Sequence, residues 1–170
     1  MDKNKGKEIK RGKYRNIGIA VFILFLAAVL VLVEKADIYG DSMSPSLLEG
    51  DCVLVEKLSY LVREPRRFDV VVFRYRDENE YYTKRIIGLP EEMVQIIDGE
   101  VYINGGRLEE PEKREKILEP GRAENPIVLG EDEYFLLGDN RNHSADSRNS
   151  DIGNVKKSRF RGRVFLRLPR

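Results

Sequence analysis

The chain has 170 residues, which is enough for one domain with its own core and a short additional segment. Its net charge of +1 hides an asymmetry: residues 1–16 carry seven Lys and Arg against two acidic residues (7 − 2 = +5), and the remainder carries 23 basic and 27 acidic residues (23 − 27 = −4). Because Cys52 is the only cysteine and His143 the only histidine, an intrachain disulfide and a C-x-x-C motif are excluded, and we expect no metal site and no cofactor.

An uncharged apolar run follows the basic N-terminus. Residues 17–33 contain only Ile, Val, Leu, Phe, Ala and one Gly. As a helix this run spans about 25 Å of a hydrocarbon core about 30 Å thick. We expect a single-pass transmembrane anchor at residues 17–35 in the cell membrane. By the positive-inside rule, residues 1–16 are then a cytoplasmic tail and residues 36–170 an extracytoplasmic domain.

Two other interpretations of the apolar run remain open. A cleaved secretory signal has a shorter apolar segment followed by a small-x-small site, whereas Glu34, Lys35, Ala36 and Asp37 form a poor cleavage site. A helix buried in a protein core does not account for the basic flank. Both fit the segment less well than an anchor.

Period-two alternation dominates the chain beyond the anchor. Segments rich in Val, Ile, Phe and Tyr predict strands at 51–58, 68–76, 81–87, 93–97, 100–103, 133–137 and 163–168. Asp98-Gly99 suits a type I′ hairpin turn, and Asn104-Gly105-Gly106 provides a second turn. No amphipathic helix pattern of useful length follows Val33. We therefore expect a mainly β domain built as an antiparallel sheet or a partly closed barrel.

Two charged segments interrupt or end this pattern. Residues 107–132 contain three prolines and predict a surface excursion with little core of its own. The basic tail from Lys156 to Arg170 is interleaved with apolar residues. We expect it to form an edge strand whose basic outer face lies near anionic lipid. Nucleic-acid binding is the alternative interpretation, and we expect no nucleic-acid partner.

A serine-containing loop lies a few residues beyond the anchor. In the sequence G-D-S-M-S-P at residues 40–45, glycine and proline constrain the loop around Ser42. Such a loop suits a nucleophile whose own backbone N–H must help to bind an oxyanion. An ordinary surface turn is the alternative interpretation.

A lysine lies within one of the predicted strands. Alternation places Lys84 on the same face as Tyr82 and Ile86, which we expect to be buried, whereas Arg85 can face water. Burial disfavours the ammonium ion and can lower its pKa by about 3 units or more, so that a neutral amine becomes available as a general base. A lysine that snorkels from a sheet edge is the alternative interpretation.

A dense polar loop, G-D-N-R-N-H-S-A-D-S-R at residues 138–148, follows an apolar strand. Within it, Asp146 and Arg148 can form an ion pair that fixes the loop and leaves Ser144 free to orient a base. A solvated loop with ordinary Asn and Ser turns is the alternative interpretation.

Taken in order, these segments resemble the type I signal peptidases, the bacterial Ser-Lys family of serine proteases. The matching pieces are S-M-S-P-S at residues 42–46, K-R-I-I-G-L-P at residues 84–90, and the whole loop at residues 138–148. The resemblance extends over essentially the whole chain and includes the N-terminal anchor and the small size typical of Gram-positive members. Three motifs in the same order make the resemblance specific.

The resemblance implies a membrane-bound endopeptidase that removes signal peptides from exported preproteins after small-x-small sites. By position, Ser42 is the nucleophile that becomes acylated, Lys84 is the general base, and Ser144 orients the lysine amine. Four further positions match the supporting residues of the family: Asp139, Asp146, Arg148 and Arg85. Four match the walls of its shallow substrate pockets: Ile38, Met43, Leu47 and Tyr82. The implied partners are preproteins, the lipid bilayer and, transiently, the export machinery.

The sequence departs from the family pattern at three places. Gly40 stands where some members have a serine whose hydroxyl adds to the oxyanion hole, so the Ser42 amide is the main identifiable donor. Glu91-Glu92 follows Leu-Pro where Gly-Asp is frequent, which affects only that local turn. His143 occupies a position in the third motif where the family does not usually have histidine.

Two rival functions also fit parts of the sequence. In a Ser-His-Asp hydrolase, His143 is the base and Asp139 or Asp146 orients it. In a catalytically inactive, membrane-tethered binding module, the cleft is retained for peptides. An inactive relative is expected to have lost Ser42 or Lys84, and both are present.

Overall fold

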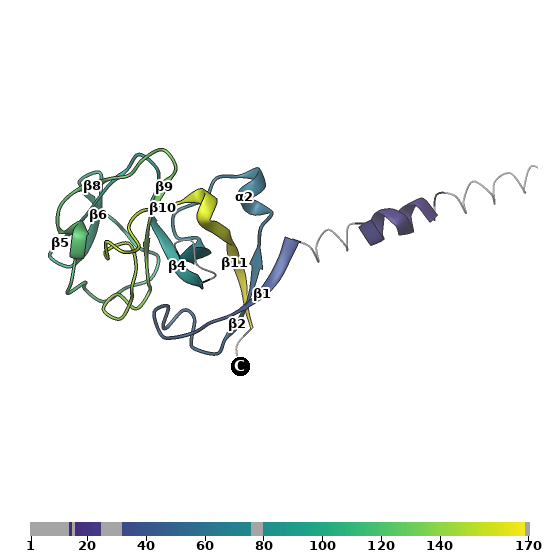
Figure 1. Ribbon diagram of the computed structural model, residues 1–170, viewed down its shortest axis with the longest axis horizontal. Coiled ribbons are helices and arrows are strands. Elements are labelled where there is room, and N and C mark those ends of the chain that lie inside the picture. Colours follow the sequence, from purple (N-terminus) through teal and green to yellow (C-terminus); the bar gives the residue numbers. More distant parts are fainter. Residues whose placement is uncertain (1–13, 15, 25–31, 76–79, 169–170) are drawn as a thin grey trace, which may run out of the picture. The chain divides into compact units, whose positions relative to one another are not determined.

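The computed structural model describes residues 14, 16–24, 32–75 and 80–168. Its strands form two antiparallel sheets, and Figure 1 shows the smaller sheet at one end of the domain and β1, β2 and β11 at the other. The mainly β, antiparallel fold predicted from the alternation is confirmed. The strands of the described ranges form two open sheets rather than the partly closed barrel that we also considered.

The larger sheet has the strand order β1-β2-β11-β3-β4-β9-β10. Its strands are β1 (Val33–Asp37), β2 (Cys52–Glu56), β3 (Val70–Tyr75), β4 (Glu80–Gly88), β9 (Glu133–Leu137), β10 (Val155–Lys156) and β11 (Phe160–Leu168). β4 pairs with β3 on one side and with β9 on the other, so it lies well inside the sheet.

The smaller sheet has the order β7-β6-β5-β8 and is built on two tight hairpins. Its strands are β5 (Met93–Ile97), β6 (Glu100–Ile103), β7 (Gly106–Arg107) and β8 (Ile127–Val128). Asp98 (φ 52°) and Gly99 (φ 80°) are both left-handed, as are Asn104 (φ 51°) and Gly105 (φ 81°). Positive φ at both central residues is what a type I′ turn requires, so both predicted turns are confirmed.

Helices are short in the described part of the domain. They are α2 (Ser59–Val62) and the 3₁₀ turns η1 (Gly121–Glu124) and η2 (Lys157–Arg159). At the N-terminus, residues 16–24 are helical and exposed. None of the helices within the described ranges is both long and apolar enough to cross a membrane. Residues 25–31 of the predicted anchor lie outside the described residues, and Val33, Glu34 and Lys35 belong to β1, so the anchor at residues 17–35 stays a prediction.

Buried side chains of the described residues form three apolar clusters. The first joins the smaller sheet to β4 and β9 through residues such as Val94, Ile87 and Phe135. The second lies against the other face of β4 and β9 and includes Ile86 and Leu136. Because Ile86 and Ile87 enter different clusters, the C-terminal half of β4 is packed on both faces, and a polar side chain in this half must find partners inside the protein. The third cluster comprises Ile38, Met43, Leu47, Val53, Val55 and Val72.

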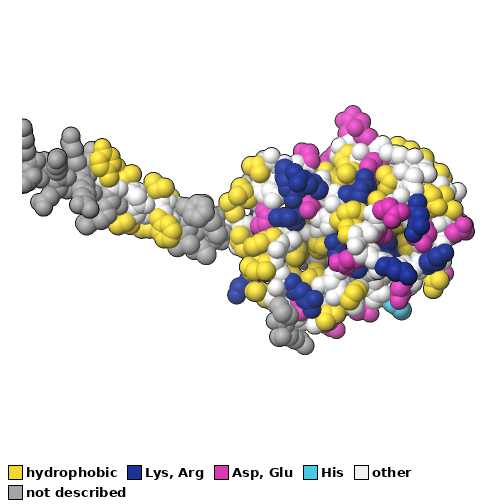
Figure 2. All heavy atoms as spheres, turned by 180° about the vertical axis from the view of Figure 1, so that it is seen from behind, with side chains coloured by type: hydrophobic (Ala, Val, Ile, Leu, Met, Phe, Trp, Pro, Cys, Tyr) yellow, Lys and Arg dark blue, Asp and Glu magenta, His cyan; other side chains and the backbone are white. Residues whose placement is uncertain are grey.

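The C-terminal strand β11 differs from the prediction. It was expected at an edge but lies between β2 and β3, and Gly162 permits close packing there because an added Cβ would lie 2.6 Å from the Glu56 carbonyl oxygen. Two of its three arginines pair with carboxylates: Arg163 with Glu56 at 2.9 Å and Arg167 with Asp51 at 2.6 Å. On the face shown in Figure 2, basic and acidic side chains are likewise interspersed. Alternation reports the face of a strand and not its neighbours, so the sequence could not reveal this position.

The excursion at residues 107–132 crosses the surface but is more than a loop. Ile117, Ala123 and Leu129 are buried in the first cluster, and β8 adds a strand to the smaller sheet. The excursion therefore has little core of its own, as predicted, and at the same time helps to complete the core of the smaller sheet.

Candidate active site

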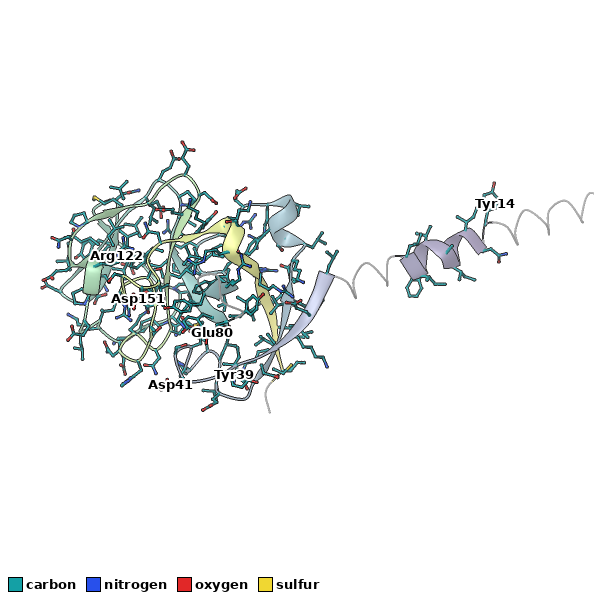
Figure 3. The ribbon with its side chains drawn as sticks, viewed as in Figure 1. Tyr14, Tyr39, Asp41, Glu80, Arg122 and Asp151 are labelled. Carbon is teal, nitrogen blue, oxygen red and sulfur yellow. The ribbon has the colours of Figure 1, made fainter. Side chains whose placement is uncertain are left out.

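The loop that carries Ser42 connects β1 to β2 and is anchored to the third apolar cluster. Gly40 has φ +74°, a conformation that favours glycine, and the buried side chain of Met43 fixes the loop to the third cluster. The Ser44 amide donates to the Asp41 carbonyl at 2.9 Å, which closes a turn around Ser42. Ser42 itself is half-buried at the surface of this loop. Figure 3 labels two further residues of the segment, Tyr39 and Asp41.

Lys84 lies in the middle of β4 and reaches the serine directly. Its ammonium nitrogen Nζ donates to Ser42 Oγ at 2.9 Å and to the Thr83 carbonyl at 3.1 Å. The side chain is almost completely buried, with a residue exposure of 4%. The Tyr82 ring lies beside it, 5.4 Å from Nζ to the ring centroid, and stacks on Tyr75. The predicted burial of the Lys84 face is confirmed, and two segments 42 residues apart meet here.

The protonation state of Lys84 is set mainly by burial. Removal from water disfavours the ammonium ion and lowers its pKa from 10.5 to about 8, although the carboxylates of Asp146 and Asp139 act in the opposite direction. Both carboxylates are engaged by arginines, which limits this opposition. About a tenth of the amine is therefore neutral near pH 7, next to a hydroxyl group that it can deprotonate.

The polar loop after β9 surrounds this pair from the other side. Asp146 accepts from Arg148 at 2.8 and 2.9 Å and from the Gly138 amide at 3.1 Å, so the predicted internal ion pair is present. The Asn140 amide donates to the Ser42 carbonyl at 3.1 Å. The loop thus contacts the backbone of the serine that carries the candidate nucleophile.

Arg85 was expected to be able to face water, but it does not. Its guanidinium donates to the Asp139 carboxylate from Nε at 2.7 Å and from Nη2 at 2.5 Å. Its Nη1 donates to the Phe68 carbonyl at 2.9 Å. Although burial raises the pKa of Asp139, the hydrogen bonds and charge of Arg85, with further help from Ser46 and Arg114, hold it below its usual value. Arg85 turns inward because it pairs with the buried carboxylate of Asp139 on a neighbouring element. No local sequence pattern reveals this partner.

Ser144 is close to the site without touching the lysine. Its Oγ is buried and has no hydrogen-bond partner among the described residues. The predicted contact that orients Lys84 is therefore not formed in this structure, in which the Thr83 carbonyl is the second acceptor for Nζ. Gly138 makes the close approach possible, because an added Cβ would lie 2.2 Å from Ser144 Oγ and 2.5 Å from the Ser42 carbonyl oxygen.

A cleft of about 290 Å³ opens beside Ser42 and Lys84. Three of the four predicted wall residues line it: Ile38, Met43 and Tyr82. Leu47 is only 5% exposed and lies instead in the third apolar cluster, so it anchors the serine loop to the core. The cleft is open on the side of Tyr39 and Tyr81, which are 82% and 45% exposed, and Figure 3 marks Glu80 at the start of the strand that carries Tyr81.

The site contains other residues that the sequence patterns did not single out. Thr83 supplies a carbonyl to Lys84, and Arg114 and Ser46 approach Asp139. Ser46 lies inside the first motif and Thr83 directly precedes the second, so their neighbourhood was predictable. Arg114 lies in the excursion, where nothing in the local sequence marks it. His143 is exposed on the polar loop. The two carboxylates that would orient it in a triad, Asp139 and Asp146, form ion pairs with arginines.

Within the described ranges, no cluster of three or more His, Cys, Asp and Glu side chains has the proximity needed to hold an ion. The cleft itself presents the Ser42 hydroxyl group and the buried Lys84 amine.

Comparison with known proteins identifies the family. The family described as "Signal peptidase, peptidase S26" matches residues 11–168. The chain belongs to this family. Signal peptidases similar to it include the probable signal peptidase I-2 of Synechocystis, 36% identical over 157 residues that cover 88% of this chain and 69% of the relative. Signal peptidase I of Bacillus licheniformis is 36% identical over 152 residues, covering 82% and 81% of the two chains.

A solved structure agrees with this assignment. The crystal structure of a signal peptidase I from Enterococcus faecalis V583 is similar with a TM-score of 0.50 and 34% sequence identity, over 62% of this chain and 99% of that one. The resemblance drawn from the three motifs is confirmed at the level of the family. The chain is accordingly a signal peptidase-type hydrolase.

Proposed function

We propose that this protein is a membrane-bound serine endopeptidase that removes signal peptides from exported preproteins, with Ser42 as nucleophile and Lys84 as general base. The observation that carries the proposal is the 2.9 Å contact between Lys84 Nζ and Ser42 Oγ inside a cleft. The signal peptidase names of its relatives support the substrate class, because those proteins share about a third of their residues with this chain.

The reaction follows from the positions of these two groups. As Ser42 Oγ attacks the scissile carbonyl carbon, its proton passes to the neutral amine of Lys84. The C–N bond then breaks, the lysine returns the proton to the leaving amine, and the signal peptide remains as an ester on Ser42. A water molecule, deprotonated by the same amine, hydrolyses this ester and restores both side chains.

The oxyanion of each tetrahedral intermediate needs a hydrogen-bond donor. The Ser42 amide is the main candidate, since Gly40 supplies no hydroxyl group. One such donor typically contributes about 3 kcal/mol to stabilisation of the transition state. The constrained backbone around Ser42 keeps this donor in place before substrate arrives.

Substrate selection follows from the walls of the cleft. Ile38 and Met43 are 4% and 1% exposed, so they are fixed by the core and cannot move aside for a large side chain. Tyr82 is held by its stack on Tyr75, with ring centroids 4.8 Å apart. Residues as small as alanine before the cut are expected to fit, which corresponds to cleavage after small-x-small sites.

A location at the membrane is part of the proposal. The basic residues 1–16 and the apolar run that begins at Ile17 support an anchor with a cytoplasmic N-terminus. The domain then lies on the opposite side, where the cleavage site of an exported preprotein emerges. Anionic lipid and transient contact with the export machinery complete the set of proposed partners.

The proposal is tested by cleavage of a preprotein that contains an Ala-x-Ala site, in detergent. Wild type is expected to cut after the second alanine, and Lys84→Met is expected to be at least about a hundredfold slower because the general base is missing. His143→Ala serves as the matched control and should retain wild-type activity. Equal rates for wild type and Lys84→Met would refute the lysine base. Loss of activity only in His143→Ala would favour the triad, and an inactive wild type would favour a binding module.

A further inference from the structure

Arg114 of the surface excursion lies inside the protein. Only 8% of its side chain is exposed, although its neighbours Glu112 and Lys113 are exposed. Its Nη2 lies 3.3 Å from an Asp139 carboxylate oxygen, 2.9 Å from Glu112 and 3.4 Å from Ser46 Oγ. A flexible, charged side chain is rarely buried in this way without a specific partner. Of its two acidic partners, Glu112 is exposed and belongs to the same segment, whereas Asp139 is buried and belongs to the polar loop.

Asp139 is contacted by two arginines from different parts of the chain. Arg85 comes from β4, directly after Lys84, and Arg114 comes from the excursion. The carboxylate has no exposed surface, so its charge must be balanced inside the protein. Both guanidinium groups also approach the Ser46 hydroxyl, at 3.4 Å each. One buried carboxylate and one hydroxyl thus connect four segments: the serine loop, the lysine strand, the polar loop and the excursion.

We propose that Arg114 is a positioning residue for the proposed peptidase reaction. It holds Asp139 and Ser46 so that the Ser42 loop and the Lys84 strand keep their relative positions. The inference rests on the proposed function and extends it to a segment that shares none of the three motifs. Misplacement of reacting groups by about 1 Å can lower a rate about a hundredfold. A small shift of the Ser42 loop relative to the Lys84 strand, after loss of the Arg114 contacts, is therefore sufficient to lower turnover.

The first test does not depend on activity. In full-length protein in detergent, hydrogen exchange is measured at the Asn140 amide, which donates to the Ser42 carbonyl. Arg114→Met is expected to speed exchange at this amide roughly tenfold, because the neighbouring Asp139 loses one of its two arginine partners. The matched control is Arg107→Met. Arg107 lies in the same excursion, is 57% exposed and pairs only at 3.5 Å with Glu100, so its loss should leave this amide unchanged.

The second test measures cleavage of the Ala-x-Ala preprotein. Arg114→Met is expected to lower kcat roughly tenfold or more with KM within about twofold, since the substrate cleft is untouched. The variant also removes one positive charge near Asp139, so the negative charge around Lys84 is less well balanced and favours the ammonium ion. The charged groups that remain around Lys84 are Asp139, Asp146, Arg85 and Arg148, and Asp37 and Asp41 line the cleft. The rise of activity with pH should therefore move to higher pH.

Arg114→Lys separates charge from geometry. A lysine keeps the charge but cannot present a planar fork, so we expect it to restore the pH profile and only part of kcat. An unchanged exchange rate at the Asn140 amide in Arg114→Met, or in Arg114→Lys if the first variant does not fold, would overturn the proposed positioning role of Arg114. Unchanged kcat in the same variants also overturns it. If wild type does not cleave the preprotein, the proposed function fails, and the exchange result alone still decides whether Arg114 holds the loop.

Discussion

Replacing Lys84 by methionine should stabilise the protein while removing its activity. The folded structure lowers the pKa of this amine from 10.5 to about 8, mainly through burial. Since one unit of pKa corresponds to about 1.4 kcal/mol, keeping the lysine charged in the folded protein costs about 3 kcal/mol at neutral pH. Methionine fills a similar volume and carries no charge, so it avoids this cost.

The pH dependence of this effect has a definite sign. Between the folded pKa of about 8 and the ordinary value of 10.5, the unfolded chain binds a proton that the folded chain does not. The stability of wild type therefore rises with pH across this window and is lowest, for this group, below it. The advantage of Lys84→Met should shrink from about 3 kcal/mol near pH 7 to about 1 kcal/mol near pH 10.

Urea unfolding followed by far-ultraviolet circular dichroism measures this difference, because the chain has no tryptophan. Other groups titrate equally in both proteins, so comparing variant with wild type at each pH isolates Lys84. Lys113→Met is the control, since it removes an exposed lysine of the same domain. A stability difference that is the same at both pH values would refute the argument that burial disfavours the charged lysine.

Three further outcomes are expected. The rate of preprotein cleavage by wild type should rise with pH and level off above about pH 8, the pKa of Lys84, and a constant rate from pH 6 to pH 9 would contradict a lysine base. Gly138→Ala should abolish activity and destabilise the fold by roughly 2 kcal/mol in thermal unfolding, because the new Cβ would lie 2.2 Å from Ser144 Oγ. Asp146→Asn should weaken the pair with Arg148, accelerate hydrogen exchange in the polar loop and reduce kcat; wild-type exchange and kcat would show that this ion pair is dispensable.

Several features followed directly from local sequence. Asp98-Gly99 and Asn104-Gly105 predicted tight turns because few other residue pairs adopt two successive left-handed conformations, and both turns are present. The alternation in β4 placed Lys84 on a buried face, since side chains of a strand point to opposite sides in turn. The three motifs, read in order, also predicted the family that the comparisons show.

Other features depend on contacts between distant segments. The sequence does not state that β11 lies between β2 and β3, or that Leu47 supports the serine loop rather than the cleft. The burial of Arg85 likewise depends on Asp139, its partner on another element. Arg114 belongs to no motif at all.

Local preferences and residue types therefore determined the turns and the face of Lys84, and the resemblance carried by the three motifs indicated the candidate nucleophile and base. Only the tertiary structure decided that Ser42 and Lys84 lie 2.9 Å apart and that Asp139 is held by two arginines. The physical reason is that backbone conformation and periodicity are properties of neighbouring residues. Strand order, burial of charge and pKa are set instead by whichever distant segments the fold brings into contact.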